Sequence, residues 1–345
     1  MAGGRSPSGG YVVAGRGPEV EIPWYRTRIE RETLRSLTRR SDARGFLQVV
    51  PHLALVILSG AAAFYAAAWW PWWTLLPILL AHGSLYAFLA NGFHELTHGT
   101  VFKTRWLNGV FLWIFSFLTW SSPVLYKASH TRHHLYTLHP PHDQEVVLPM
   151  RLTLRGFLLS AVIDPLGFYG TIWNTVRVAF GRLKGPWENA LFPQTEPVER
   201  RRLFRWARIT LAGHAIIVAF SVVTGWWLVA VLTTGAAFYG RWVFFLNTYS
   251  QHTGLQDNVP DFRLCTRTIV HNPVLQYLYF HMNYHAEHHM YASVPCYNLR
   301  RLRRAIGHDM PKAKGMIGSW RDIIAILRRQ RSDPTYQYEY ELPRS

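Results

Sequence analysis

The sequence has little cysteine and little charge, and both shortages limit what the chain can be. Cys265 and Cys296 are its two cysteines. They stand far apart without CxxC spacing, so a disulfide framework is not indicated. Charged residues make up 17% of the 345 residues, against 49% hydrophobic and 15% aromatic residues. This composition is typical of a membrane protein with polar segments attached, rather than of two soluble domains.

Acidic side chains are also scarce relative to basic ones. The chain has 20 Asp and Glu against 37 Lys and Arg, which gives a formal net charge of +17. The basic residues flank apolar runs, as they do in the cytoplasmic loops of membrane proteins. No nucleic-acid recognition motif accompanies them, so the excess predicts membrane topology and no nucleic-acid partner.

Four apolar segments come close to the roughly 20 residues that cross a hydrocarbon core. They cover about 51–69, 73–93, 207–225 and 226–246. Within each pair of segments the joining turn is rich in tryptophan (Trp69, Trp70, Trp72 and Trp73; Trp226 and Trp227) and carries no charge. Because tryptophan favours the membrane interface and basic flanks favour the cytoplasm, both turns are predicted to face outward.

Two further apolar stretches are not expected to cross the membrane as straight helices. Residues 106–124 have basic residues on both sides, and a single crossing would leave one basic flank outside, so a re-entrant or interfacial segment is predicted. Residues 152–180 contain charges and Pro165, which favours amphipathic interfacial helices.

The ends of the chain are basic. Residues 1–45 are predicted to form a cytoplasmic arm, residues 46–310 the membrane domain and residues 311–345 a cytoplasmic tail. The basic helical stretch at 298–331 is expected to be a solvated face, with docking of an acidic redox partner as a second role.

Histidine is the residue type that departs from the rest of the composition. Eight of the 17 histidines fall in three clusters: HELTH at 94–98, HTRHH at 130–134 and HAEHH at 285–289. Residues three or four apart share one face of a helix, so each cluster can direct two or three imidazoles to one place. Eight imidazoles exceed the four ligands that one zinc ion usually takes. The spacing predicts two metal ions, and imidazole alone does not select among iron, zinc, copper and nickel.

The order and spacing of these boxes resemble those of the membrane fatty acid desaturase and hydroxylase superfamily. The similarity covers roughly residues 46–310 and includes the ending His289-Met-Tyr-Ala-Ser-Val-Pro295. The resemblance implies an all-α integral membrane fold, with four transmembrane helices and a cytosolic helical cap that carries the metal site. It also implies a non-haem centre of two iron ions with O₂ as co-substrate. The carried-over metal ligands are His94, His98, His130, His133, His134, His285, His288 and His289.

The resemblance implies a ninth histidine ligand just after the fourth span. His252 is the best match, and His281 competes for this role, with Asn247 or Asn283 as water-bridged neighbours. Ligating imidazoles are usually oriented by carboxylates or carbonyls. Available acids are Glu95, Asp143, Glu145, Asp257 and Glu287, of which Asp143 and Glu287 are expected to rank first.

The remaining histidines carry weaker signals. His139 and His142 follow the second box and are expected to support it or to hold a loop rather than to bind metal. His82 and His214 lie within predicted spans. There, a functional role and a hydrogen bond between helices are equally compatible with the sequence.

The predicted reaction is O₂-dependent removal of hydrogen from a lipid-like alkyl chain. Desaturation of a fatty acyl lipid is the leading expectation, and a hydroxylase, a carotenoid ketolase and an alkene-forming decarboxylase share the same boxes. A metal transporter is disfavoured because the boxes lie at span ends. No haem-binding, iron–sulfur or GxGxxG pattern is present, so a separate ferredoxin, rubredoxin or cytochrome b5 with a reductase is expected to supply electrons. The implied location is the bacterial inner membrane, with the metal site and both termini cytoplasmic.

Overall fold

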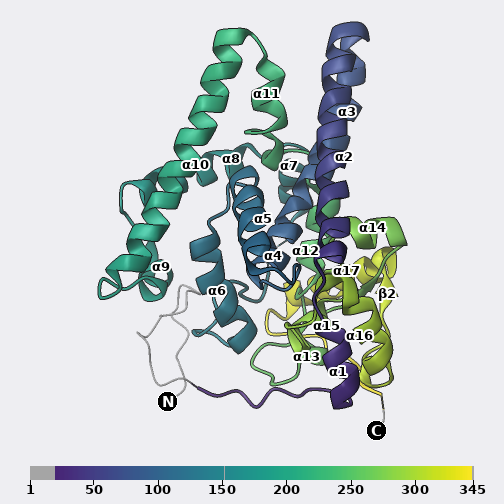
Figure 1. The fold of residues 1–345 in the computed structure, drawn as a ribbon. Coiled ribbons are helices and arrows are strands. Elements are labelled where there is room, and N and C mark those ends of the chain that lie inside the picture. The colour runs from purple at the N-terminus through teal and green to yellow at the C-terminus, as the bar shows by residue number, and fades with distance from the viewer. Residues whose placement is uncertain (1–19, 151, 344–345) are drawn as a thin grey trace.

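The computed structural model describes residues 20–150 and 152–343, and helices account for most of this part of the chain (Figure 1). The two strands are short: β1 (Ile269–Val270) pairs in parallel with β2 (Lys314–Gly315). The expected helical architecture is confirmed. The first 19 residues of the expected arm and the last two of the expected tail lie outside the described residues.

Among the described residues, three helical stretches are long and apolar enough to cross a membrane. They are α2 (Asp42–Trp69), α3 (Leu75–Ala87) continued by α4 (Leu89–Thr97), and α10 (Pro197–Thr224). In the apolar part of each stretch only 22–33% is buried, so most of this apolar surface faces outward. Extended apolar surface of this kind suits hydrocarbon rather than water.

The tryptophan turns lie together at one end of the molecule. The first includes η1 (Trp72–Thr74), and the second joins α10 to α11 (Trp227–Leu232). Figure 1 places both turns at the end opposite to α15 (His285–Met290). The tryptophan side chains of these turns are exposed, as an interfacial belt requires.

The segment 226–246 is not the single continuous helix that its composition predicted. Helix α11 ends after six residues, η2 (Ala236–Phe238) follows, and α12 (Trp242–Ser250) begins after Gly240. Gly240 has a φ of +66°, and a Cβ atom there would lie 2.6 Å from the carbonyl oxygen of Leu80. The chain therefore breaks where α3 approaches its backbone, and this long-range contact leaves no trace in the hydropathy.

Polar side chains from other elements satisfy the carbonyl groups that this break leaves open. An unpaired carbonyl in hydrocarbon is unfavourable by several kcal/mol. The pairs are His82 Nε2 with Leu232 O (3.0 Å), Tyr86 OH with Thr233 O (3.1 Å) and Trp120 Nε1 with Thr234 O (3.0 Å). His214 Nδ1 also lies 3.1 Å from Thr234 Oγ1. The two histidines inside the spans thus join helices by hydrogen bonds.

Helices α5 (Arg105–Leu118) and α6 (Pro123–Tyr136) form a pair bent by 104°. The chain leaves the region of His98 to enter α5 and returns to it along α6, since Nε2 of His98 and Nε2 of His130 are 3.2 Å apart. A single straight crossing would separate its two ends by about 30 Å. Residues 106–124 therefore do not form a further straight span, in agreement with the sequence-based expectation.

Residues 152–180 form two short helices, as their amphipathic pattern predicted. Helix α7 (Leu154–Val162) is followed by α8 (Pro165–Ala179), and the Asp164 side chain accepts the backbone N–H of Gly167 at 2.8 Å to cap α8. Proline at the first helical position explains where α8 begins. Helix α9 (Gly185–Leu191) then leads into α10.

The remaining elements pack around the end of the spans that is opposite to the tryptophan turns. From the N-terminal side comes α1 (Arg31–Leu37). From the C-terminal side come α13 (Phe262–Cys265), α14 (Pro273–Leu278), α15, η3 (Cys296–Asn298), α16 (Leu299–Ile306), η4 (Gly307–Asp309) and α17 (Met316–Ser332). One hydrophobic core includes side chains from α1, α2, α4, α5, α15 and α16, so this helical cap and the spans share their interior.

A polar cluster fastens the segment before α1 to the cap. Arg263 pairs with Asp261 at 2.8 Å and with Asp309 at 2.5 Å. The hydroxyl groups of Tyr25 and Thr27 donate to Asp309 at 2.7 and 2.6 Å. The N-terminal segment is therefore held by charge-assisted hydrogen bonds at η4, close in sequence to α16.

Candidate metal centre

Four parts of the chain bring histidines to the junction between the spans and the cap. The first box lies at the end of α4, the second on the last turns of α6 and the third on α15, while His252 follows α12. Except for His98 and His134, which are partly exposed, these side chains are buried. The structure thus collects all nine histidines that the sequence singled out as ligands, although they are separated by up to 195 positions in the chain.

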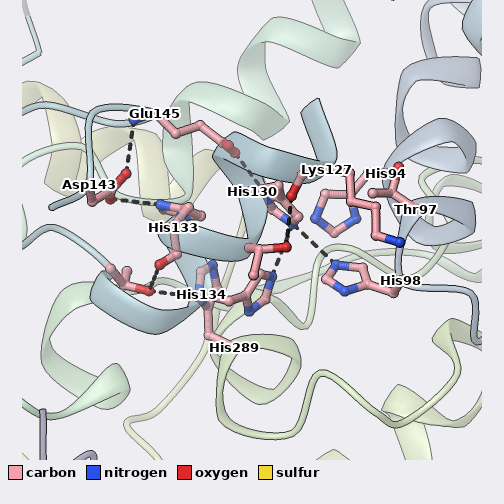
Figure 2. Close-up of polar contacts among 12 residues, drawn as sticks. His94, Thr97, His98, Lys127, His130, His133, His134, Asp143, Glu145 and His289 are labelled. Atoms are coloured by element: carbon pink, nitrogen blue, oxygen red, sulfur yellow. Dashed lines mark hydrogen bonds and ion pairs between the residues drawn. The ribbon is translucent and has the colours of Figure 1, made fainter. Parts of the chain in front are cut away.

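The nine histidines divide into two groups. The first group, of five, comprises His94, His98, His130, His134 and His288. Within it, His130 Nε2 lies 3.2 Å from His98 Nε2 and 3.0 Å from His134 Nε2. Figure 2 shows these three rings turned toward one another. Their ligand atoms, one per residue, lie within 4.8 Å of one another, a spread that suits ligands of a single ion.

The second group, of four, comprises His133, His252, His285 and His289. His285 Nε2 lies 2.9 Å from His252 Nε2 and 3.1 Å from His289 Nε2. All four side chains are at most 3% exposed. The two groups adjoin, because the His134 and His289 rings stack with centroids 4.4 Å apart.

Helical spacing explains how one box serves both groups. On α6, His130 and His134 are four residues apart and enter the five-histidine group, whereas His133 enters the four-histidine group. On α15, His285 and His289 enter the four-histidine group and His288 the other. Residues at i and i+4 lie on one stripe, and the residue at i+3 is displaced around the helix. The HxxHH pattern therefore places two neighbouring sets of ligands on each helix.

Three of the imidazoles contact a carboxylate through Nδ1. Asp143 Oδ2 lies 2.8 Å from His133 Nδ1, and Glu145 Oε1 lies 2.8 Å from His130 Nδ1 (Figure 2). Glu95 Oε1 lies 3.2 Å from His94 Nδ1. An Nδ1–H that donates to a carboxylate leaves the Nε2 lone pair available, which is the arrangement that metal-binding histidines commonly show.

Neutral groups orient two imidazoles of the four-histidine group. The carbonyl oxygen of Cys265 lies 2.8 Å from His252 Nδ1, and the hydroxyl of Thr137 lies 3.1 Å from His289 Nδ1. Neither partner could be predicted from the sequence, because every residue has a backbone carbonyl and threonine is common in loops. Both contacts again leave Nε2 directed at the group.

Whether the histidines suit metal ions depends on their protonation state and on ring nitrogens that have no hydrogen-bond partner. Burial lowers the pKa of His252 to about 3, and burial also places the pKa values of His285, His288 and His289 well below the usual value. These imidazoles are therefore neutral, as metal ligands must be. Among the described residues, buried ring nitrogens of His94, His134, His285 and His288 have no hydrogen-bond partner. Buried nitrogen donors in two converging sets, with the unpaired Nε2 atoms of His94 and His288 among them, fit two metal ions.

Several expected supporting residues lie elsewhere. Glu287, expected among the first to orient an imidazole, instead accepts from Arg303 at 2.8 Å and from Thr268 at 2.5 Å, because its side chain leaves α15 on the side facing α16. His281 belongs to neither group, and its Nδ1 lies 3.0 Å from Gln276 Nε2. Asn247 bonds to His271 and to the carbonyl oxygen of Val243.

Two further residues named in the sequence also serve the surrounding structure. Asp257 accepts from Gln337 at 2.7 Å, which ties the C-terminal segment to the cap. His139 Nδ1 lies 2.8 Å from the carbonyl oxygen of Thr137 and so stabilises the loop after α6. Glu145 contacts His130 although the sequence favoured Asp143 and Glu287 for this role. Its contact with His130 depends on how the loop after α6 folds back.

The fold and the site together define a membrane protein with two adjoining polyhistidine groups suited to metal ions. A family model described as Fatty acid desaturase matches residues 67–320, a stretch that contains all nine histidines. The chain belongs to the fatty acid desaturase family, as the sequence resemblance indicated. Membership makes it an oxidoreductase with a lipid substrate. No curated protein matches the chain.

Proposed function

We propose that the protein is an O₂-dependent desaturase of fatty acyl lipids, with one iron ion in each histidine group. The observation that carries this proposal is the pair of adjoining groups of five and four imidazoles at the end of the spans opposite to the tryptophan turns. Imidazole binds several first-row metals, and family membership favours iron among them.

Two bound iron ions would supply the O₂-activating chemistry that an unactivated C–H bond requires. The overall change joins O₂, two electrons and two protons with a –CH₂–CH₂– unit, and it yields a –CH=CH– unit and two water molecules. Asp143, Glu145 and Glu95 would hold His133, His130 and His94 in the orientation that presents Nε2. Burial of the four-histidine group excludes bulk water from that side of the site.

Access to the site is unequal, which favours approach of substrate from the five-histidine side. His98 and His134 are partly exposed, whereas every member of the four-histidine group is buried. An alkyl chain entering past His98 and His134 would reach both groups, because the His134 ring stacks on His289.

The proposal includes sidedness and an external source of electrons. The cap and its basic segments, with residues 1–45 as an arm and 311–345 as a tail around a membrane domain of residues 46–310, would face the cytoplasm of a bacterial cell. Arginines of α16 would attract an acidic ferredoxin, rubredoxin or cytochrome b5, which receives its electrons from a reductase.

Product analysis tests the proposal. The iron-loaded protein is supplied with a reductase, an electron donor and O₂, and a panel of acyl lipids is examined by mass spectrometry. We expect an O₂-dependent product that lacks two hydrogens. His133→Ala should abolish it, whereas His139→Ala, a matched change outside both groups, should not. An alcohol as the main product would replace desaturation by hydroxylation, and metal flux in liposomes without oxidation would overturn both.

A further inference from the structure

A groove runs along the outside of the bent pair α5–α6, where α9 and the first half of α10 face it. Its volume is about 1080 Å³, which reaches the upper end of the range of about 300–1,000 Å³ typical of small-molecule sites. The groove has space for a lipid headgroup and a length of acyl chain. No residue of the two histidine groups lines it.

The lining of this groove changes from basic to apolar along α10. Arg202, Arg205 and Ile209 follow one another on one face of that helix, and Ile209 lies further into the apolar span. Trp113 of α5 and Val124 of α6 continue the apolar wall. The groove therefore has the polarity gradient of an amphiphile whose charged end stays near the membrane surface.

The basic end of the groove carries cations that lack acidic partners. Arg202 pairs with Glu199 at 2.7 Å. Within residues 20–150 and 152–343, no ion pair involves Lys127, Arg132 or Arg205. Glu196 and Glu199 are the acids in the lining, so four cations exceed two acids there. The surplus suits an anionic group such as phosphate.

Lys127 connects the groove to the five-histidine group. His130, Thr131 and His134 lie three, four and seven residues after Lys127 on α6 and are therefore its neighbours on the same side of that helix. Figure 2 shows Lys127 on the same helix as His130, and its side chain is exposed. A headgroup bound at Lys127 would therefore lie about one helical turn from a predicted metal ligand, at the partly exposed side of the site.

We propose that this groove binds a membrane phospholipid, with the phosphate at Lys127, Arg132 and Arg205 and an acyl chain along Trp113, Val124 and Ile209. The assignment of this lipid as the substrate rests on the proposed function, whereas the binding itself does not. A bilayer lipid is favoured over an acidic protein because the apolar wall continues into the lipid-facing surface of α10.

Equilibrium binding of fluorescent phosphatidylglycerol to the purified full-length protein, without O₂ or electron donor, tests the inference. Competitors are unlabelled phosphatidylglycerol, diacylglycerol, glycerol phosphate and an acidic peptide. We expect phosphatidylglycerol to compete best, since diacylglycerol lacks the phosphate and glycerol phosphate lacks the chains. Lys127→Gln with Arg205→Gln should weaken binding roughly 10-fold or more. Arg321→Gln with Arg328→Gln, which removes two exposed cations from α17, should leave binding unchanged.

Three results would overturn the inference: equal competition by diacylglycerol, equal competition by the acidic peptide, or unchanged binding in a folded Lys127/Arg205 variant. Thermal unfolding and metal content verify that this variant folds. If no lipid is oxidised while phosphatidylglycerol still binds through these cations, the proposed function is wrong and the proposal of lipid binding in the groove is supported. If lipids are oxidised but the variant binds normally, the groove fails and the function stands.

Discussion

The carboxylate of Asp143 holds His133 and the turn that follows α6 at the same time. Its Oδ2 atom lies 2.8 Å from His133 Nδ1 and accepts the backbone N–H of Leu138 at 2.9 Å, while Oδ1 accepts the N–H of Glu145 at 2.9 Å. Burial alone would raise the pKa of Asp143, but His133 and these N–H groups outweigh it, and the pKa is lowered. The side chain is therefore an anion that fixes both the tautomer of His133 and the position of Glu145.

Asp143→Asn should weaken metal binding, because the amide can no longer accept as an anion from His133 and from the turn. Loss of a partner of this kind commonly lowers metal affinity by about 10- to 100-fold. Metal titration with measurement of bound ions tests this. Asp257→Asn is the matched control, since Asp257 bonds to Gln337 away from the site. Equal affinities in the wild type and Asp143→Asn would contradict the assigned role.

His252→Ala should reduce the metal content by close to one ion per chain, whereas His281→Ala should not. Loss of His252 leaves three imidazoles in the four-histidine group, while His281 stands outside both groups. Elemental analysis of the purified variants gives the stoichiometry. A loss of metal in His281→Ala with full retention in His252→Ala would reverse the assignment of the ninth ligand.

Glu145 and Glu287 should respond differently to the same change. Glu145→Gln removes the anion behind His130 and should lower metal affinity by about 10- to 100-fold. Glu287→Gln should keep the metal and instead destabilise the protein by about 1–3 kcal/mol, because Arg303 loses its buried partner. Metal titration and thermal unfolding, measured on both variants, separate the two effects.

Gly83→Ala should destabilise the membrane part. A Cβ atom at this position would lie 2.3 Å from the carbonyl oxygen of Tyr239, which belongs to the broken segment. Such overpacking is unfavourable by about 1–3 kcal/mol. Gly109→Ala in α5 has open space and should be neutral or slightly stabilising. Thermal unfolding in detergent compares the two, and equal melting temperatures would refute the close approach of α3.

Asp309 should make stability depend on acid pH. Burial raises its pKa, but the hydroxyls of Thr27 and Tyr25 and the charge of Arg263 lower it more, so the net shift is downward. A lowered pKa stabilises the fold above the unfolded value near 3.8, and this contribution disappears as pH falls through the folded value. Asp309→Asn should therefore melt earlier than the wild type at neutral pH. The difference should shrink below about pH 4, and a constant difference would exclude this cause.

The sequence predicted those features that depend on local spacing. Eight candidate ligands follow from i, i+3 and i+4 positions in the three boxes and His252 from the family resemblance, and the structure collects all nine. The two long hairpin turns follow from paired tryptophans between apolar runs. The charges that flank residues 106–124 correctly argued against another straight span.

Features that depend on contacts between distant segments could not be predicted from local spacing. Nothing near Gly240 in the sequence reports the approach of Leu80, so residues 226–246 resembled an ordinary span. Glu287 lies inside the third box, yet the direction of its side chain is decided by Arg303 on α16. The division of the boxes into groups of five and four likewise requires the crossing of α4, α6 and α15.

The break from Leu232 to Gly240 has a consequence for the order of membrane assembly. Its carbonyl groups are satisfied by His82 and Tyr86 of α3 and by Trp120 after α5. Before those elements are in place, the same groups would lie open to hydrocarbon, at several kcal/mol each. The segment can settle at its final depth only after α3 and α5 have inserted and met. His82, Tyr86 and Trp120 thus supply the hydrogen bonds that residues 232–234 need before they can lie within the membrane.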